Sequence, residues 1–261
     1  MKAILLCAGQ GRRLLPLTDD RPKCLVEVGG RTMLERQIRA LAAIGIDEIV
    51  VATGFRAAQI DALLGGLDGS LPPIRTTLNP FFTCSDNLAT CWLTRHEMTE
   101  PFVLINGDTL FEPAVAGTLL AEPDAYPILV TVDRKPGYDE DDMKVVIEDD
   151  RVAAIGKQHF DRIDAESIGM LRFNVEGARL FREELDRMMR EPHGQARWYL
   201  SAIDVLARDR HVGYCDIRGL RWCEIDTPSD LAQAASRLEP AADRPGDDAR
   251  RSSQSGRRRP A

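Results

Sequence analysis

The amino-acid sequence predicts an α/β fold, a single Rossmann-like domain with a doubly wound, mostly parallel sheet and a β-hairpin insertion. Short apolar runs alternate along the chain with segments whose apolar residues recur at helical spacing. This alternation is typical of a parallel sheet covered by helices. The first run, residues 2–7, also ends at a glycine-rich turn, which favours a buried strand. Ligands of such sheets bind beyond the carboxyl ends of the strands, so we expect the functional site there.

Length and composition indicate one folded domain with a tail. The 261 residues, of which 44% are hydrophobic and 29% charged, are enough for one large core. We assign residues 1–238 to the domain and expect residues 239–261 to be disordered. That tail is rich in Pro, Gly, Ser, Asp and Arg, and it holds no apolar residue larger than alanine or proline.

Charge and cysteine usage narrow the classes of partner and the compartment. The formal net charge of −7 argues against general nucleic-acid binding, which needs a basic face. The six cysteines form no C-x-x-C pair and mostly lie in apolar runs, which indicates reduced thiols. With no apolar stretch of membrane-spanning length and a core strand at the N-terminus, we expect a cytoplasmic protein without a membrane partner.

The first half of the chain predicts four strands separated by three helices. Thr32-x-x-Glu35 is a capping box, which satisfies free N–H groups at a helix start, and Gly45 ends that helix. Strands are expected at 2–7, 48–53, 74–78 and 102–105, with helices at about 32–45, 55–64 and 84–98.

The second half is less regular. Residues 144–148 and 151–155 are expected to pair as a hairpin across Asp149-Asp150. Thr227 is expected to cap a last helix that has Pro228 in its first position and ends near residue 238. Further strands are expected at 127–132, 167–173 and 212–217, with helices at 175–189 and 198–207.

An anion-binding loop follows the first strand. In the turn 8–11, two glycines let backbone N–H groups approach phosphates closely, because no Cβ stands in the way. Three cations, Arg12, Arg13 and Lys23, follow within a dozen residues. Leu14 stands where a dinucleotide-binding fingerprint needs its third glycine, and the Gly-Lys-Ser/Thr of a P-loop is absent from this loop.

The pattern Gly9-x-Gly11-x-Arg13-Leu14-x-Pro16, followed by Pro22-Lys23, resembles the signature of the nucleoside-triphosphate transferase family. Members of that family join a nucleoside monophosphate to a phosphorylated sugar, alcohol or amine and release pyrophosphate. The resemblance implies a nucleotide-diphospho-sugar transferase-like fold. It also implies an active site that aligns two anions and neutralises growing negative charge.

Two carboxylates are the expected metal ligands. Asp108 follows Gly107 at the end of a buried strand, and Asp226 ends the run Glu-Ile-Asp before a helix. Both resemble the acids that hold the metal in the family. Mg²⁺ prefers oxygen ligands, so we expect Mg²⁺ on Asp108 and Asp226. Leu110 stands where the family has a second acid after Gly-Asp, which makes Asp226 more important.

The resemblance assigns the other roles. Arg13 and Lys23 are expected at the β- and γ-phosphates and Lys157 at the acceptor phosphate, as the three catalytic cations. The residues expected to bind the nucleotide are Ala8, Gly9, Gly11, Arg13, Lys23, Asn79, Ser85, Asn87 and Asp108.

Within the family, Asn79-Pro80 and Ser85-Asp86-Asn87 are similar to the phosphocholine-type cytidylyltransferases, although asparagine is commoner than Asp86. Further matches, up to about residue 236, are Asp142-Met143-Lys144-Val145, Lys157, Glu166 to Gly169, Trp198-Tyr199 and Trp222-x-Glu224-Ile225-Asp226-Thr227. The resemblance implies transfer of CMP from CTP to a small phosphorylated or phosphonylated amine or alcohol, such as phosphocholine, phosphoethanolamine or 2-aminoethylphosphonate.

The acceptor is expected to contact Lys157, Glu166, Trp198 and Tyr199. Tyr138 and Trp222 could add aromatic faces to those of Trp198 and Tyr199, and such faces together with the acidic run 139–142 suit a cationic amine. The competing interpretation is that the tryptophans pack in the core and the acidic run is a solvated loop. Two other functions stay open, namely a sugar-1-phosphate nucleotidylyltransferase using UTP or dTTP, and a nucleotide-sensing domain without turnover. The presence of both acids with Arg13 and Lys23 argues against a sensor, which needs no metal-holding pair.

Overall fold

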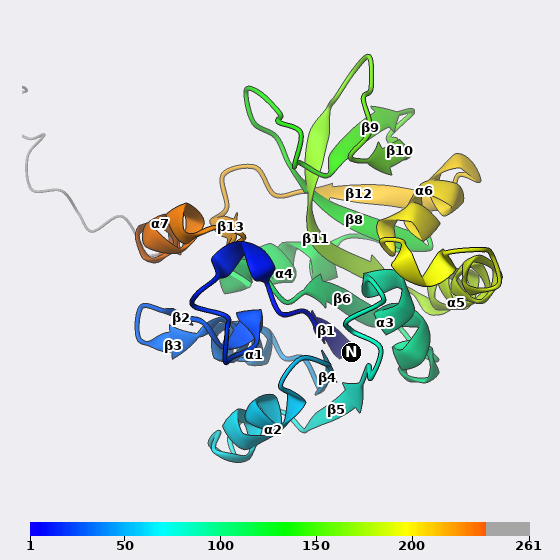
Figure 1. Cartoon of the computed structure of the whole chain (residues 1–261). Coiled ribbons are helices and arrows are strands. Elements are labelled where there is room, and N and C mark those ends of the chain that lie inside the picture. Colours follow the sequence, from blue (N-terminus) through cyan, green and yellow to red (C-terminus); the bar gives the residue numbers. More distant parts are fainter. Residues whose placement is uncertain (239–261) are drawn as a thin grey trace, which may run out of the picture.

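The computed structural model describes residues 1–238, and the tail 239–261 that we expect to be disordered lies outside the described residues. A nine-stranded sheet is central (Figure 1). Seven strands follow one another in the order β10-β9-β11-β6-β1-β4-β5, while β8 pairs with β11 and β12. The strands are β1 (Lys2–Cys7), β4 (Glu48–Thr53), β5 (Ile74–Leu78), β6 (Phe102–Asn106), β8 (Ile128–Asp133), β9 (Lys144–Glu148), β10 (Arg151–Gly156), β11 (Ala165–Phe173) and β12 (Val212–Asp216).

The sheet is parallel in its first half and mixed in its second. β1 pairs in parallel with both β4 and β6, and β4 with β5. β11 is antiparallel to its neighbours β6, β8 and β9, and β10 is antiparallel to β9. Within residues 1–238, β10 and β11 are therefore antiparallel to the other strands of the sheet. This arrangement confirms the expected α/β fold with its hairpin of β9 and β10.

Helices cover both faces of the sheet. One face packs on α3 (Asn87–Thr94), α5 (Val175–Met189) and α6 (Leu200–Arg208), and the other on α1 (Met33–Ala43), α2 (Ala57–Gly65) and α4 (Pro113–Ala121). Side chains of β1 alternate between the two cores, with Ile4 in the first and Ala3 and Leu5 in the second. None of the helices within residues 1–238 is long and apolar enough to cross a membrane.

A smaller third core lies beside the sheet. It joins two short ribbons, β2 (Glu27–Val28) with β3 (Arg31–Thr32) and β7 (Thr109–Phe111) with β13 (Trp222–Glu224), to α7 (Pro228–Leu238). Leu14, Met33, Ile225 and Ala234 are its fully buried members. This core attaches the glycine-rich loop and the last helix to the carboxyl edge of the sheet.

Most expected elements are present, and the differences are local. The helix expected over 84–98 is shorter, because the Asp86 side chain accepts a hydrogen bond from the N–H of Asn87 and caps α3 there. A 3-10 turn, Arg95–Glu97, continues it. Sequence reasoning did not identify α4, which is apolar nearly all round and so lacks the one-sided pattern of an amphipathic helix.

Candidate active site

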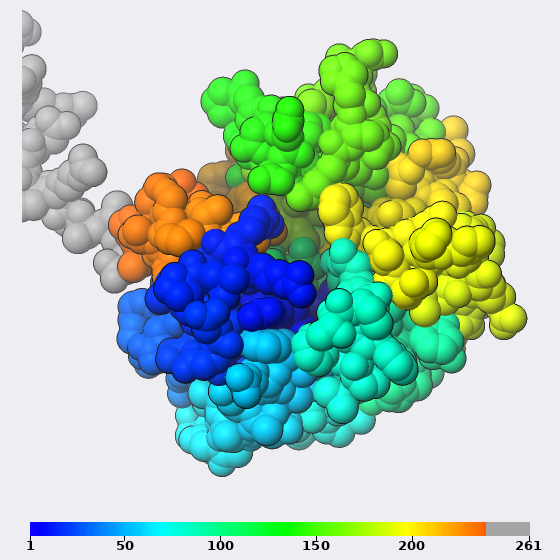
Figure 2. Space-filling model, viewed as in Figure 1, coloured from blue at the N-terminus to red at the C-terminus, as the bar shows by residue number. Residues whose placement is uncertain are grey.

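A cleft opens at the carboxyl ends of β1 and β6. Two adjoining cavities of about 420 Å³ and 200 Å³ form it. Both are lined by Gly9, Asp86, Asn87, Asn106 and Asp108. In the space-filling view the cleft is the hollow between the N-terminal segment, the green region around β9 and the yellow region before α6 (Figure 2). Its position matches the rule for ligand sites in α/β sheets.

The glycine-rich loop forms one wall of the cleft. Gly11 has a φ of 78°, and a Cβ on it would lie 2.7 Å from the Cβ of Lys23. Only glycine fits this backbone against the lysine stem. The Thr18 hydroxyl donates to the carbonyl of Gly11 over 2.9 Å, which fixes the loop from behind. The 3-10 turn Arg12–Leu14 follows, with Leu14 fully buried as its anchor.

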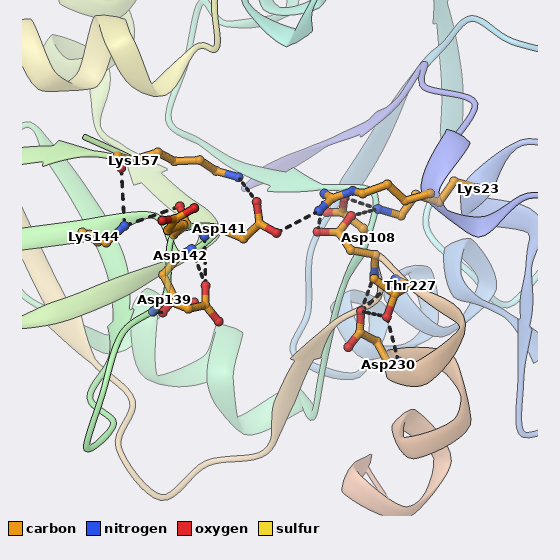
Figure 3. A network of polar contacts seen from close by, with 12 residues as sticks. Lys23, Asp108, Asp139, Asp141, Asp142, Lys144, Lys157, Thr227 and Asp230 are labelled. Atoms are coloured by element: carbon orange, nitrogen blue, oxygen red, sulfur yellow. Dashed lines mark hydrogen bonds and ion pairs between the residues drawn. The ribbon is translucent and has the colours of Figure 1, made fainter. Parts of the chain in front are cut away.

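Lys23 joins two carboxylates that lie far apart in the sequence. Its Nζ lies 2.7 Å from Oδ2 of Asp108 and 2.5 Å from Oδ1 of Asp226 (Figure 3). Arg13 Nη2 contacts the other oxygen of Asp226 at 2.7 Å. Burial lowers the pKa of Lys23, but the two carboxylates outweigh burial, so its pKa is raised and the side chain stays charged.

The start of α7 positions Asp226. The Asp230 carboxylate accepts hydrogen bonds from the N–H groups of Asp226 and Thr227, and the Thr227 hydroxyl accepts from the N–H of Asp230. This is a reciprocal cap, as the sequence predicts (Figure 3). The cap leaves both Asp226 oxygens for the two cations in the cleft.

Glu224 is a third acid in the cluster, and sequence reasoning did not assign it to the metal. Its carboxylate, with those of Asp108 and Asp226, offers oxygens that all lie within 4.8 Å of one another. Although Glu224 is exposed at the mouth of the cleft, desolvation by the surrounding protein and the negative charges of Asp108 and Asp226 raise its pKa to about 8, and of these causes the two close charges are the firmer one. The sequence signal that could have identified Glu224 is its spacing of two residues from Asp226, because side chains two residues apart on a strand project to the same face.

The three acids could hold a divalent cation. Carboxylate oxygens are the donors that hard cations such as Mg²⁺ prefer. Oδ1 of Asp108 is buried and has no hydrogen-bond partner among residues 1–238, which leaves one oxygen uncompensated in the cleft. Asp108 and Asp226, the two expected ligands, therefore lie together, and Glu224 completes a set of three.

Asp141 bridges the two sides of the cleft. Its carboxylate lies 3.4 Å from Nη1 of Arg13 and 3.7 Å from Nζ of Lys157 (Figure 3). Lys157 also lies over the ring of Trp198, 5.1 Å from its centroid. Because Asp141 is largely exposed, these ion pairs are weak and leave both cations available to an anion.

Six of the nine residues expected at the nucleotide line the smaller cavity, while Gly11, Arg13 and Lys23 line the larger one. The six are Ala8, Gly9, Asn79, Ser85, Asn87 and Asp108. Asn79 is buried and already occupied, since it donates to Ser85 and Thr90 and accepts from the N–H of Phe81. Asn87 accepts from the N–H of Tyr199. Their side chains therefore shape this end of the cleft. Burial raises the pKa of Asp86 beside them.

The structure corrects two of the four expected acceptor residues. Tyr199 is fully buried against Phe181, and its hydroxyl has no partner within the described chain, so its ring belongs to the core. Glu166 is also buried and pairs with Lys135 at 2.7 Å. Neither lines the cleft, whereas Lys157 and Trp198 do. Spacing alone could not separate the neighbours Trp198 and Tyr199.

Of the other aromatic and acidic candidates for the acceptor site, some line the cleft and others pair with residues outside it. Trp222 donates its indole N–H to Asp133 over 2.8 Å, and Tyr138 lies over Lys135. Within the acidic run 139–142, only Asp141 lines the cleft, while Asp142 pairs with Lys135. For most of these aromatic and acidic residues, the competing interpretation of a structural role outside the acceptor site therefore holds.

Comparison with known proteins gives a family for residues 3–199, the MobA-like NTP transferase domain. CMP-5'-(3-aminopropyl)phosphonate synthase of Streptomyces rubellomurinus is 31% identical over 249 residues, which is 92% of this chain and 39% of that protein. The chain thus spans well under half of that relative. CTP:phosphoglutamine cytidylyltransferase of Campylobacter jejuni is 26% identical over 88% of this chain and 98% of its own length.

A solved structure shares the fold. CTP:phosphocholine cytidylyltransferase of Streptococcus pneumoniae superposes with a TM-score of 0.72 at 22% identity, covering 90% of this chain and 97% of that one.

Proposed function

The chain belongs to the family of MobA-like NTP transferase domains, and from this premise we propose that it is a cytidylyltransferase. It transfers CMP from CTP to a small phosphorylated or phosphonylated amine or alcohol and releases pyrophosphate. One observation carries the proposal: a glycine-rich loop, Lys23 and three carboxylates meet in a single cleft. Such a site offers what nucleotidyl transfer needs, cations for the phosphates and oxygen ligands for a metal.

In the proposed reaction an oxygen of the acceptor phosphate or phosphonate attacks the α-phosphorus of CTP. The new P–O bond forms as the bond to the β-phosphate oxygen breaks, and pyrophosphate leaves with that electron pair. The residues of this chain align the two anions. The loop at Gly9 and Gly11, with Arg13 and Lys23, binds the triphosphate, and Lys157 binds the acceptor phosphate.

Mg²⁺ is the proposed cofactor, held by Asp108, Glu224 and Asp226. When bound, it would neutralise negative charge on the phosphates as the P–O bond breaks. Binding of the nucleotide and the metal would draw Lys23 and Arg13 from their carboxylate partners to phosphate oxygens. The ion pairs of the free protein therefore keep these cations ordered within reach of the substrate.

A cationic acceptor suits the outer end of the cleft. Trp198 presents a partly exposed ring there, and the carboxylates of Asp86 and Asp141 line the same cavity. An aromatic face and negative charge together attract an ammonium group. The names of the three relatives agree, since aminopropylphosphonate, phosphoglutamine and phosphocholine all carry nitrogen and a phosphorus oxyanion.

Pyrophosphate release over a grid of substrates tests the proposal. The nucleotides are CTP, UTP and dTTP, and the acceptors are 2-aminoethylphosphonate, phosphocholine, phosphoethanolamine and glucose 1-phosphate, with Mg²⁺ or EDTA. We expect turnover to be highest with CTP and one cationic acceptor and to stop in EDTA. Fastest turnover with glucose 1-phosphate and UTP or dTTP would instead show a sugar-phosphate enzyme. Absence of turnover in the whole grid would favour a nucleotide-binding domain.

A further inference from the structure

A second cationic cavity lies at the opposite end of the β7–β13 ribbon from the carboxylate cluster. It has a volume of about 320 Å³, and we call it the arginine pocket. Its residues come from α1, from the start of β3, from the end of β7 and the start of α4, from the residue before β13 and from the end of α7, elements that Figure 1 labels. Four of them are arginines, Arg31, Arg36, Arg39 and Arg221, and the acid that lines it is Glu112.

The arginines differ in how far they are neutralised. Arg221 pairs with Glu112 at 2.5 Å, and Arg39 pairs with Glu35 at 2.8 Å. Arg31 is exposed and reaches Glu35 only at 3.7 Å. Glu35 serves both Arg31 and Arg39, and Asp68 lies 3.3 Å from Arg39 as well. With Glu112, three carboxylates face four arginines, so the pocket keeps one excess positive charge in a chain whose net charge is −7.

Arg36 is the key residue of the pocket. Its Nε and Nη2 donate to the backbone carbonyls of Val28 and Gly29, and it has no carboxylate within 4 Å in residues 1–238. Gly29 has a φ of 56°, and a Cβ on it would lie 2.5 Å from Nη2 of Arg36. The hairpin turn thus holds the guanidinium in place. A fixed, half-buried guanidinium without an acid is well suited to bind a phosphate oxyanion.

The floor of the pocket is apolar, formed by Leu110 and Phe111 with Leu238 at its edge. A low-dielectric floor strengthens the attraction between the guanidinium groups and an anion. The β7–β13 ribbon runs from the arginine pocket to the carboxylate cluster of the cleft. Phe111 pairs with Trp222 at the pocket end of the ribbon, and Thr109 pairs with Glu224 at the carboxylate end.

We propose that the arginine pocket binds a small phosphate-bearing anion at a site separate from the cleft. Arg36 and Arg31 supply the charge, and Arg39 and Arg221 complete the walls. The site does not depend on the proposed reaction, because its residues lie outside the cleft.

Calorimetric titration with pyrophosphate tests this inference on the full chain. Wild-type protein is expected to bind it in two events, one in the cleft and one in the pocket. Arg36→Gln and Arg31→Glu should each weaken one event by about tenfold or more, the loss typical of a charge-assisted contact. Lys23→Ala should weaken only the other event. Arg182→Gln and Arg182→Glu are the controls matched in charge to Arg36→Gln and Arg31→Glu, since that arginine also bonds a backbone carbonyl and α5 covers the other face of the sheet from α1.

Stability is checked by thermal melting. If Arg36→Gln does not fold, Arg31→Glu decides alone, because Arg31 is exposed and its substitution removes no buried contact. A single binding event that Lys23→Ala removes, and that both pocket variants leave at wild-type affinity, would overturn the proposal. So would a loss in each pocket variant that equals the loss in its Arg182 control, because it would reflect net charge alone.

Discussion

Two lysines of this protein each lie between two carboxylates, yet their surroundings differ. Lys23 contacts Asp108 and Asp226 at 2.7 and 2.5 Å. Lys135 contacts Asp142 and Glu166, both at 2.7 Å. In each case burial lowers the lysine pKa, but the two acids outweigh burial and raise the pKa, so both lysines stay charged. The contact geometry alone would therefore give the two clusters the same role.

The residues around each lysine cluster distinguish the two clusters. The Lys23 cluster includes Glu224, adjoins the glycine-rich loop and lines the cleft, where phosphates and a metal can reach it. Lys135 instead has the ring of Tyr138 over it, 5.8 Å from its Nζ. We conclude that access to the cleft decides the role, and not solvent exposure, since the Lys135 side chain is 33% exposed and that of Lys23 only 12%. Partner exchange is possible in the first cluster, whereas the second holds the segment before β9 against β11.

The largest expected effect concerns the metal ligands. Asp108→Asn and Asp226→Asn should each lower kcat by about a hundredfold or more, because ~3 kcal/mol of charge stabilisation in the transition state is lost. Steady-state pyrophosphate release at saturating substrates measures this. Asp142→Asn, the counterpart in the Lys135 cluster, should keep kcat within about threefold. Similar kcat losses in all three variants would mean that access does not separate the clusters.

The next effect compares the two lysines. Lys23→Ala should lower kcat/KM for CTP by about 10- to 100-fold, since a cation ~4 Å from a phosphate charge contributes up to about 4 kcal/mol before desolvation. Lys135→Ala should leave kcat/KM unchanged but lower the free energy of unfolding by about 1–3 kcal/mol, because the buried Glu166 and the half-buried Asp142 lose their cation. Kinetics and urea unfolding of both variants measure this. Unchanged CTP affinity and turnover in Lys23→Ala would remove Lys23 from the triphosphate site.

The Lys135 cluster should also make stability depend on pH. Burial and the nearby Asp142 raise the pKa of Glu166 to about 7, although Lys135 opposes this shift. Glu166 therefore binds a proton more tightly in the folded than in the unfolded chain. The stability from this proton is present below the unfolded pKa, near 4.5, and is lost as pH rises through about 7. The pKa of Asp142 is lowered, so its contribution is lost only in acid.

Glu166→Gln should remove that loss, because a glutamine cannot ionise. Its free energy of unfolding should stay level between pH 5 and 8 where the wild-type value falls, by on the order of 1–3 kcal/mol. Urea unfolding at several pH values measures this, with the exposed Glu183→Gln as the control. Parallel pH profiles in wild-type protein and Glu166→Gln would contradict the assignment.

The smallest effect concerns the neighbours Trp198 and Tyr199. Trp198→Ala should raise the KM for a cationic acceptor by about 2- to 30-fold, as ~0.5–2 kcal/mol of cation–π attraction predicts, and leave the KM for CTP nearly unchanged. Tyr199→Phe should change neither KM, because its hydroxyl is buried without a partner in the described residues. An acceptor KM that responds to Tyr199→Phe and not to Trp198→Ala would reverse our assignment.

Much of the fold and part of the site could be predicted from the sequence. The alternation of apolar runs with helical patterns determined the sheet, because each strand and helix signals itself locally. The cap at Thr227 and the turn at Gly11 were predictable for the same reason, since a specific backbone conformation needs a specific residue type. The resemblance added Lys23, Asp108 and Asp226, which the fold brings together.

Only the tertiary structure decided which polar side chains share an environment. Glu224 joins the acids because β13 pairs with β7, more than a hundred residues away in the sequence. Tyr199 and Glu166 are excluded from the cleft because packing turns one into the core and the other toward Lys135. A local sequence pattern links residue types to a local backbone structure, whereas burial and charge pairing depend on segments that are distant in the sequence.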